Sequence, residues 1–202
     1  MTPQLAYPLP PGFHGLSPHK PIDFYLRHLP HWRQDGATYA VTFRLADSIP
    51  QARLRELRHL RKTWEATHPE PRTDADWQAY ARQYTRQVKA WMDEGHGACH
   101  LRDRDLAAIV TESLLHFNGD HYELGAFVVM PNHCHAVVRP FNDWQVEAIV
   151  GTWKQYTALR LNRALGLQGH FGRARLSIEL SATEFTFGTA FSISATIHKT
   201  RD

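Results

Sequence analysis

The pattern of apolar and polar positions along the chain predicts three strands, two of them by strict alternation. Residues 39–45 carry a large apolar side chain at every second position, the period of a strand with one buried face. Residues 122–130 form a second strand-like run. Residues 133–139 alternate again after Pro131 and Asn132, a pair typical of a turn. These three segments are the predicted strands of the fold.

Apolar positions at helical spacing predict four helices, at about residues 51–67, 74–94, 103–116 and 143–165. Arginines and lysines cover much of the first helix, and we interpret them as a solvated face. The second helix carries an aromatic stripe, whose spacing favours a seam facing the core over a platform for stacking bases. The stripe consists of Trp77, Tyr80, Tyr84, Val88 and Trp91.

Length and composition restrict the class of protein. The 202 residues correspond to about one domain, and 43% hydrophobic residues are too many for a disordered chain. No apolar run approaches the roughly 20 residues of a membrane span, so we expect no membrane partner. Cys99 and Cys134 allow one disulfide at most, and the proline-rich start does not resemble a signal peptide. We therefore expect a cytoplasmic protein.

The chain divides into three segments by composition. Residues 1–28 are rich in proline, which disfavours helix interiors and central strands and predicts an extended leader. Residues 29–171 contain all the predicted helices and strands. Residues 172–202 lose this periodicity and are dominated by Ser, Thr, Ala and Phe. We interpret this last segment as an aberrant tail.

A pair of histidines is the main candidate for chemistry. His133 and His135 share one face of the third predicted strand, while Cys134 points to the other. Side chains two residues apart on a strand lie about 6 to 7 Å apart at the backbone, so both imidazoles can reach one metal ion. Spacing alone leaves a second interpretation open, a pair of ordinary, partly buried histidines.

The residues around this pair resemble the REP-associated tyrosine transposases, relatives of the insertion-sequence transposases of the HUH class. That family carries two histidines separated by one hydrophobic residue, and Val129–His135 reads VMPNHCH, with Cys134 in the middle position. Further segments that resemble the family are Leu29–Trp32, Tyr39–Leu45, Gly119–Tyr122 and Trp153–Arg163. Together with the motif, the similar segments extend from residue 29 to about residue 171.

The resemblance implies a single-domain α+β fold of the HUH, ferredoxin-like type, with helices packed on an antiparallel sheet. It also implies binding of single-stranded or hairpin DNA, and the family's enzymes often act as homodimers. These enzymes nick DNA with the help of a divalent ion, usually Mg²⁺ or Mn²⁺. A tyrosine hydroxyl attacks phosphorus, leaving a 5′-phosphotyrosine and a free 3′-OH.

The same resemblance assigns roles to residues of this chain. His133 and His135 are expected to be metal ligands, and a third, oxygen ligand and the phosphate should complete the coordination shell of a hard ion. Lys154, Arg160 and Asn162 are expected near the DNA, where basic and amide groups contact phosphates or bases. A solvated helix face is the alternative for these three residues.

The end of the chain departs from the family. The family's nucleophilic tyrosine lies on a helix near the C-terminus, and no tyrosine follows Tyr156 here. We read the codons from Phe171 onward one frame over, so that the third base of each codon is joined to the first two bases of the next. This frame can encode the peptide WQSE, then one residue that does not match the family, and then FDRIIRD. Further along the gene, the same frame can encode the peptide YIGNN. We therefore hypothesise a frameshift near Phe171 that removes the catalytic helix, with a genuinely divergent C-terminus as the alternative.

Two functions from different classes follow. The first is a transposase that nicks DNA and transfers strands at hairpin (REP-type) sequences, with Tyr156 as a fallback nucleophile. The second is a catalytically inactive DNA-binding remnant that has lost its tyrosine helix. A third option is a histidine-rich metal-binding protein unrelated to DNA.

Overall fold

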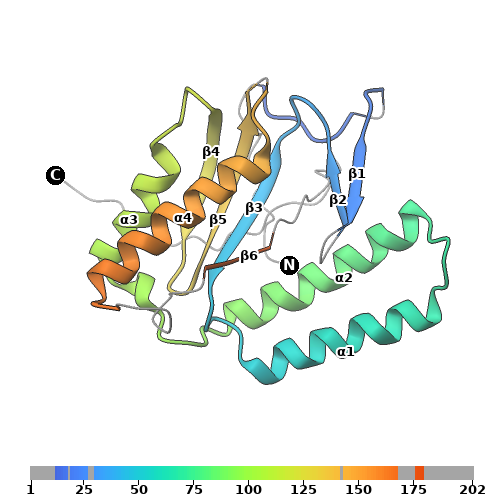
Figure 1. Ribbon diagram of the computed structural model, residues 1–202, viewed down its shortest axis with the longest axis horizontal. Coiled ribbons are helices and arrows are strands. Elements are labelled where there is room, and N and C mark those ends of the chain that lie inside the picture. Colours follow the sequence, from blue (N-terminus) through green and yellow to red (C-terminus); the bar gives the residue numbers. More distant parts are fainter. Residues whose placement is uncertain (1–11, 18, 27–29, 142, 168–175, 180–202) are drawn as a thin grey trace, which may run out of the picture.

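Helices and antiparallel strands make up the part of the chain that the computed structural model describes, residues 12–17, 19–26, 30–141, 143–167 and 176–179 (Figure 1). The helices are α1 (Gln51–Thr67), α2 (Asp74–Asp93), a short 3-10 helix (His100–Arg102), α3 (Arg104–Leu115) and α4 (Val146–Ala164). The strands are β1 (Asp23–Leu26), β2 (Pro30–Arg33), β3 (Tyr39–Leu45), β4 (Tyr122–Val129), β5 (His133–Pro140) and β6 (Leu176–Glu179). The protein therefore has the predicted α+β architecture with antiparallel strands.

A four-stranded sheet in the order β4-β5-β3-β6 forms the centre of the fold. Strands β4 and β5 are joined by the predicted turn at Pro131 and Asn132. Strand β5 also pairs with β3, so that residues far apart in sequence become direct neighbours. In this register Thr42 lies opposite His135, and Arg44 lies opposite His133.

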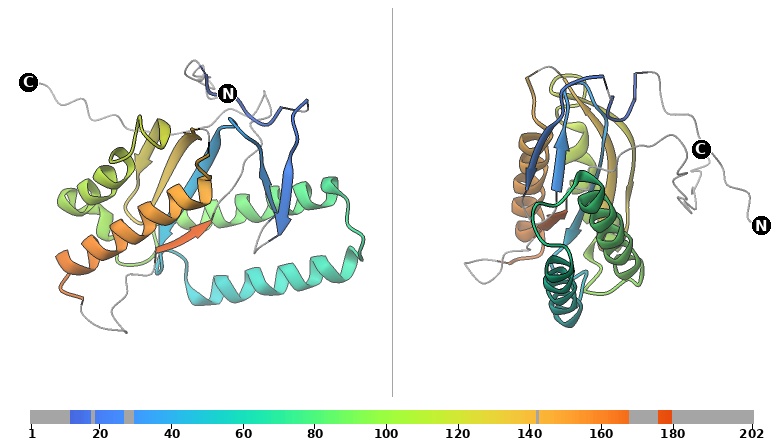
Figure 2. Two further views of the ribbon diagram at one scale, coloured as in Figure 1. Left: turned by 45° about the horizontal axis from the view of Figure 1, so that its top comes forward. Right: turned by 90° about the vertical axis from the view of Figure 1, so that its right-hand side faces the viewer.

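Helices α3 and α4 cover one face of this sheet (Figures 1 and 2). Alternate residues of β3 and β5, among them Val41, Phe43 and Cys134, pack with the inner positions of both helices in one hydrophobic cluster. Tyr122 and Trp153 strengthen the contact between sheet and α4, because Trp153 Nε1 donates a 2.8 Å hydrogen bond to the Tyr122 hydroxyl. Since strand side chains alternate, His133 and His135 lie on the opposite face.

The hairpin of α1 and α2 lies beside the sheet, next to β2 (Figure 1). Helix α2 begins with a capping box between Thr73 and Asp76, which satisfies backbone donors of its first turn. The aromatic stripe of α2 is buried against α1, as predicted: Trp77 and Tyr80 pack on Trp64, with ring centroids 5.0 and 4.6 Å from it. These rings form a core seam and not an exposed stacking surface.

The structure adds details that the periodicity did not predict. Strand β3 is buried on both faces, although its pattern predicted one buried face. Strands β1 and β2 pair with each other, so residues 23–26 of the predicted leader belong to an antiparallel ribbon. Strand β6 pairs with β3 and lies in the predicted tail, most of which is outside the described residues. Among the helices of the described ranges, none has the length and apolar character needed to cross a membrane.

Candidate functional site

The two histidines of the motif lie side by side on β5, as predicted. His133 is buried, with 1% of its surface exposed, and His135 is half-buried. Their Nε2 atoms are 3.1 Å apart, and the two rings meet edge to face with centroids 4.7 Å apart. Both imidazoles therefore direct the same nitrogen to one point on the face of the sheet away from α3 and α4.

Asn132 fixes the proton position on His133. The buried Asn132 amide nitrogen donates hydrogen bonds to the backbone carbonyls of Met92, at 3.3 Å, and His96, at 3.0 Å. This assigns the amide oxygen as the atom that faces His133 Nδ1, at 2.8 Å. An amide oxygen can only accept, so Nδ1 carries the proton and Nε2 of neutral His133 keeps a free lone pair.

Thr42 plays a comparable part for His135. The Thr42 hydroxyl lies 2.7 Å from His135 Nδ1, across the β3–β5 pairing. A hydroxyl can donate or accept, so Thr42 is compatible with either tautomer of the ring. In one tautomer, Nε2–H of His135 donates to Nε2 of His133, and the Thr42 hydroxyl donates to Nδ1 of His135. In the other tautomer, Nδ1 of His135 carries the proton and donates to the Thr42 hydroxyl, which leaves Nε2 of His135 free to bind a metal.

The surroundings favour the neutral form of both imidazoles. Burial lowers the pKa of His133, although the carboxylate of Asp93 opposes this shift. Burial also lowers the pKa of His135 to about 4, and positive charge on His133 and Lys89 acts in the same direction. Both rings are therefore uncharged at neutral pH, and the neutral imidazole is the form that binds a metal ion.

Cys134 takes no part in this site, as its place on the strand predicts. Its side chain is fully buried in the cluster beneath α3 and α4. Burial raises the pKa of the thiol well above its ordinary value, so the sulfur stays protonated and is a poor nucleophile and metal ligand.

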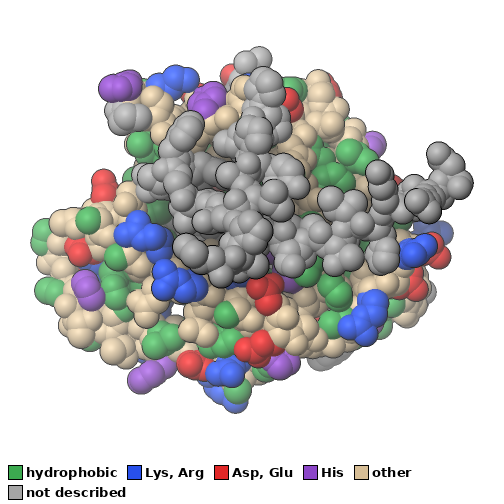
Figure 3. Space-filling model, turned by 180° about the vertical axis from the view of Figure 1, so that it is seen from behind, with side chains coloured by type: hydrophobic (Ala, Val, Ile, Leu, Met, Phe, Trp, Pro, Cys, Tyr) green, Lys and Arg blue, Asp and Glu red, His purple; other side chains and the backbone are tan. Residues whose placement is uncertain are grey.

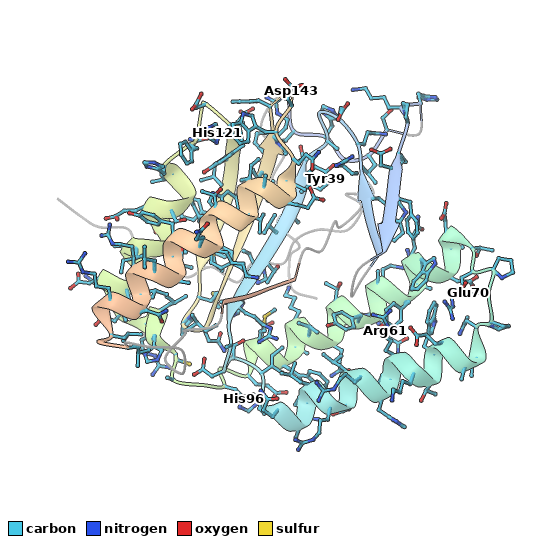
Figure 4. The ribbon with its side chains drawn as sticks, viewed as in Figure 1. Tyr39, Arg61, Glu70, His96, His121 and Asp143 are labelled. Atoms are coloured by element: carbon cyan, nitrogen blue, oxygen red, sulfur yellow. The ribbon has the colours of Figure 1, made fainter. Side chains whose placement is uncertain are left out.

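The end of α2 contributes charged groups to the histidine pair. Asp93 Oδ1 lies 3.9 Å from His133 Nε2, and the Asp93 side chain is half-exposed. The last turn of α2 and the loop after it are held to the β4–β5 turn by the two hydrogen bonds of Asn132, and Figure 4 shows His96 at this end of the helix. Tyr39 marks the opposite end of β3 in the same view.

The pair fits part of a divalent-metal site. Two neighbouring ligands on an octahedral ion with bonds of about 2.1 Å lie about 3.0 Å apart, close to the observed 3.1 Å between the Nε2 atoms. Each ring also has the outer hydrogen bond on Nδ1 that metal-binding histidines usually have. Within the described ranges, however, no group of three or more His, Cys, Asp or Glu side chains is arranged around one metal position.

The residues predicted to contact DNA lie elsewhere. Lys154, Arg160 and Asn162 are on α4, which packs on the face of the sheet opposite to the histidines. Arg160 is exposed and lies 3.6 Å from Glu112 on α3. On the side facing away from α4, the visible Lys and Arg side chains are mixed with Asp and Glu (Figure 3). The structure therefore does not join these three residues and the histidine pair into one site.

Tyr156 is also separated from the histidine pair. It lies on α4, and its hydroxyl accepts a 2.8 Å hydrogen bond from Arg160. The hydroxyl of Tyr39 is bonded to the Gln34 backbone, and that of Tyr122 to Leu114 and Trp153. Tyr80 and Tyr84 pack in the aromatic cluster of the α1–α2 hairpin. Tyr7 and the side chain of Tyr25 lie outside the described part.

Sequence reasoning missed the residues that orient and surround the histidines. Asn132 precedes His133 directly, and its polarity within a turn gave no sign of its contact with α2. Thr42 gave a weak signal, since it is a polar residue on the same strand face as Arg44. No signal in the sequence pointed to Asp93, because it lies 40 residues before His133 and only the fold brings the two together.

Comparison with known proteins adds no family assignment to this geometry. Searches against models of protein families, against curated proteins and against solved structures each found no match. The chemistry of the site is therefore inferred from its own residues and from the resemblance of the VMPNHCH motif.

Proposed function

We propose that this chain is the HUH domain of a protein related to the REP-associated tyrosine transposases, built for metal-dependent nicking and strand transfer of single-stranded or hairpin DNA. One observation carries the proposal: two neutral imidazoles direct their Nε2 atoms to one point, 3.1 Å apart, within the motif VMPNHCH. The antiparallel sheet that presents them agrees with the fold the resemblance implies.

In this proposal His133 and His135 hold Mg²⁺ or Mn²⁺ through Nε2. When bound, the ion polarises the scissile phosphate and stabilises the negative charge that develops there. Asn132 keeps the proton of His133 on Nδ1, and the Thr42 hydroxyl accepts a hydrogen bond from the Nδ1–H of His135. Among the carboxylates of the described residues, that of Asp93 can supply an oxygen ligand after its half-exposed side chain rotates.

The second candidate is a DNA-binding remnant that no longer cleaves, and the positions of the tyrosines favour it. Tyr39, Tyr122 and Tyr156 have hydroxyls engaged away from the histidine pair. The sequence contains no tyrosine after Tyr156, where the family has its nucleophile. We therefore expect the chain as written to bind DNA without forming a covalent adduct.

Incubation with labelled single-stranded hairpin DNA and Mn²⁺, followed by a denaturing gel, distinguishes these candidates. A covalent adduct that His133→Ala abolishes would establish an active transposase and contradict the loss of the nucleophile. DNA binding without an adduct would support the inactive remnant. Metal binding without affinity for DNA would contradict both and favour a metal-binding protein unrelated to DNA.

A further inference from the structure

Arg44 is an arginine buried on the face of the sheet that carries the histidines. It lies on β3 with 6% of its surface exposed, and no carboxylate in the described structure pairs with it. Its Nη1 donates to the backbone carbonyls of Leu45 and Ala46, at 3.3 and 3.4 Å. Its Nε is buried and has no hydrogen-bond partner, and Nη2 makes no hydrogen bond within the described residues.

This arrangement is costly unless an anion completes it. A guanidinium keeps its charge at every physiological pH, and arginines are almost never buried without a partner. A buried donor that is left unpaired carries its full desolvation penalty, and this penalty is larger for a charged group. Arg139 shows the usual solution in the same sheet, since it is more exposed than Arg44 and still pairs with Glu123.

The position of Arg44 indicates which anion would fit. Arg44 is the direct cross-strand neighbour of His133, and Thr42, on the same face of β3, is the neighbour of His135. Directly opposed residues of antiparallel strands have Cβ atoms about 4.5–5.5 Å apart. Because Nη1 is held by carbonyls, the unpaired Nε–H and Nη2 form the edge of the guanidinium that binds two oxygens of a phosphate.

We propose that Arg44 binds a phosphate group of single-stranded DNA beside the histidine pair. The proposal deepens the proposed function and rests on it for the identity of the ligand. In this arrangement β3 contacts the DNA backbone through Arg44, and β5 binds the metal through His133 and His135. The alternative is a purely structural role, in which Nη1 braces the turn between β3 and α1.

The first test measures anion binding without DNA or metal. Thermal unfolding of the full chain in EDTA is compared in inorganic phosphate and in chloride at equal ionic strength. Phosphate should raise the unfolding midpoint of the wild type more than that of Arg44→Met, which has a similar length and no charge. Equal midpoint shifts in the two proteins would overturn the proposal.

The second test measures affinity for labelled hairpin DNA in EDTA over a series of salt concentrations. Arg44→Met should bind about tenfold or more weakly, and the slope of log affinity against log salt should fall in magnitude by about 0.7, the value for one phosphate contact to a single strand. Arg44→Lys keeps the charge but lacks the two-pronged edge, so it should retain the slope and lose part of the affinity. It also provides the readout if Arg44→Met fails to fold.

Arg55→Met is the matched control, because Arg55 is exposed on α1 and the change removes the same charge. If Arg55→Met and Arg44→Met weaken binding equally, the effect comes from net charge and the Arg44 proposal fails. If Arg44→Met binds like the wild type, the proposal also fails, whereas the proposed function stands. If the wild type itself does not bind DNA, the proposed function fails, and the phosphate test alone decides whether Arg44 holds an anion.

Discussion

Outer hydrogen bonds distinguish His133 and His135 from ordinary histidines of a protein surface. Asn132 and Thr42 each bond one Nδ1, which leaves both Nε2 atoms directed to the same point. Because the Asn132 amide is itself fixed by two carbonyls, the tautomer of His133 is set before any ligand arrives. This preorganisation is the structural basis for expecting metal binding.

Replacement of Asn132 should weaken metal binding. In Asn132→Ala the His133 ring loses its orienting acceptor, and loss of such an outer-shell partner typically reduces metal affinity about 10- to 100-fold. Calorimetric titration with Mn²⁺ measures the change. Cys134→Ala, on the same strand but facing the core, is the control and should keep the wild-type affinity. Equal affinities of Asn132→Ala and the wild type would show that Asn132 does not orient the ligand.

The lowered pKa values of the two histidines predict loss of stability in acid. Below about pH 6.5 the unfolded chain protonates these rings while the folded protein does not, so folding becomes less favourable as the pH falls towards 4. The free energy of unfolding in EDTA should fall by up to about 1.4 kcal/mol per pH unit for each histidine. Urea denaturation between pH 7 and pH 5 tests this, and His135→Gln should show a shallower dependence than the wild type.

At the scale of elements, the α1–α2 hairpin packs around its own aromatic seam, with Trp32 of β2 against it, and reaches the four-stranded sheet at its C-terminal end. Its aromatic seam is internal, with Trp77 and Tyr80 buried against Trp64. Its C-terminal end reaches the site, where Asp93 approaches His133 and the following loop bonds Asn132. The hairpin therefore supports the β4–β5 turn from which the histidine strand begins.

Truncation within this seam should lower stability strongly. Trp77→Ala removes a buried indole in contact with Trp64 and Tyr80, a change that typically costs about 3–5 kcal/mol. Leu159→Ala on α4 is the control, because 69% of Leu159 is exposed and its loss should change stability by less than about 0.5 kcal/mol. Urea denaturation of both variants measures the difference. Similar values for the two would show that the seam contributes little to folding.

At the scale of the whole molecule, the sheet separates two groups of residues that the sequence placed in one hypothesis. The histidines and Arg44 occupy one face, whereas α4 with Tyr156, Lys154 and Arg160 covers the other. A nucleophile for phosphate chemistry must approach the histidine face. The structure gives Tyr156 no route to that face, so catalysis by the proposed mechanism requires a tyrosine from elsewhere.

Restoring the reading frame near Phe171 should restore cleavage. If the frameshift hypothesis is correct, sequencing the gene will show the alternative codons, and the chain translated in that frame will carry a tyrosine in its C-terminal helix. That chain should form a covalent adduct with hairpin DNA in Mn²⁺, and a Tyr→Phe change in the restored helix should abolish it. A gene whose other frame lacks these codons would refute the hypothesis.

The sequence by itself determined the four helices, the strands β3, β4 and β5, and the histidine pair. Helix α1 has the predicted bounds, β3 and β5 lie where alternation placed them, and β4 lies within the predicted strand 122–130, because the periods of helices and strands depend on neighbouring residues. Alternation also placed His133 and His135 on one face. The tertiary structure alone decided that Asn132 bonds the loop after α2, that Asp93 approaches His133 and that Arg44 is buried with no carboxylate paired to it among the described residues. These features depend on contacts between distant segments, which leave no periodic signal in the sequence.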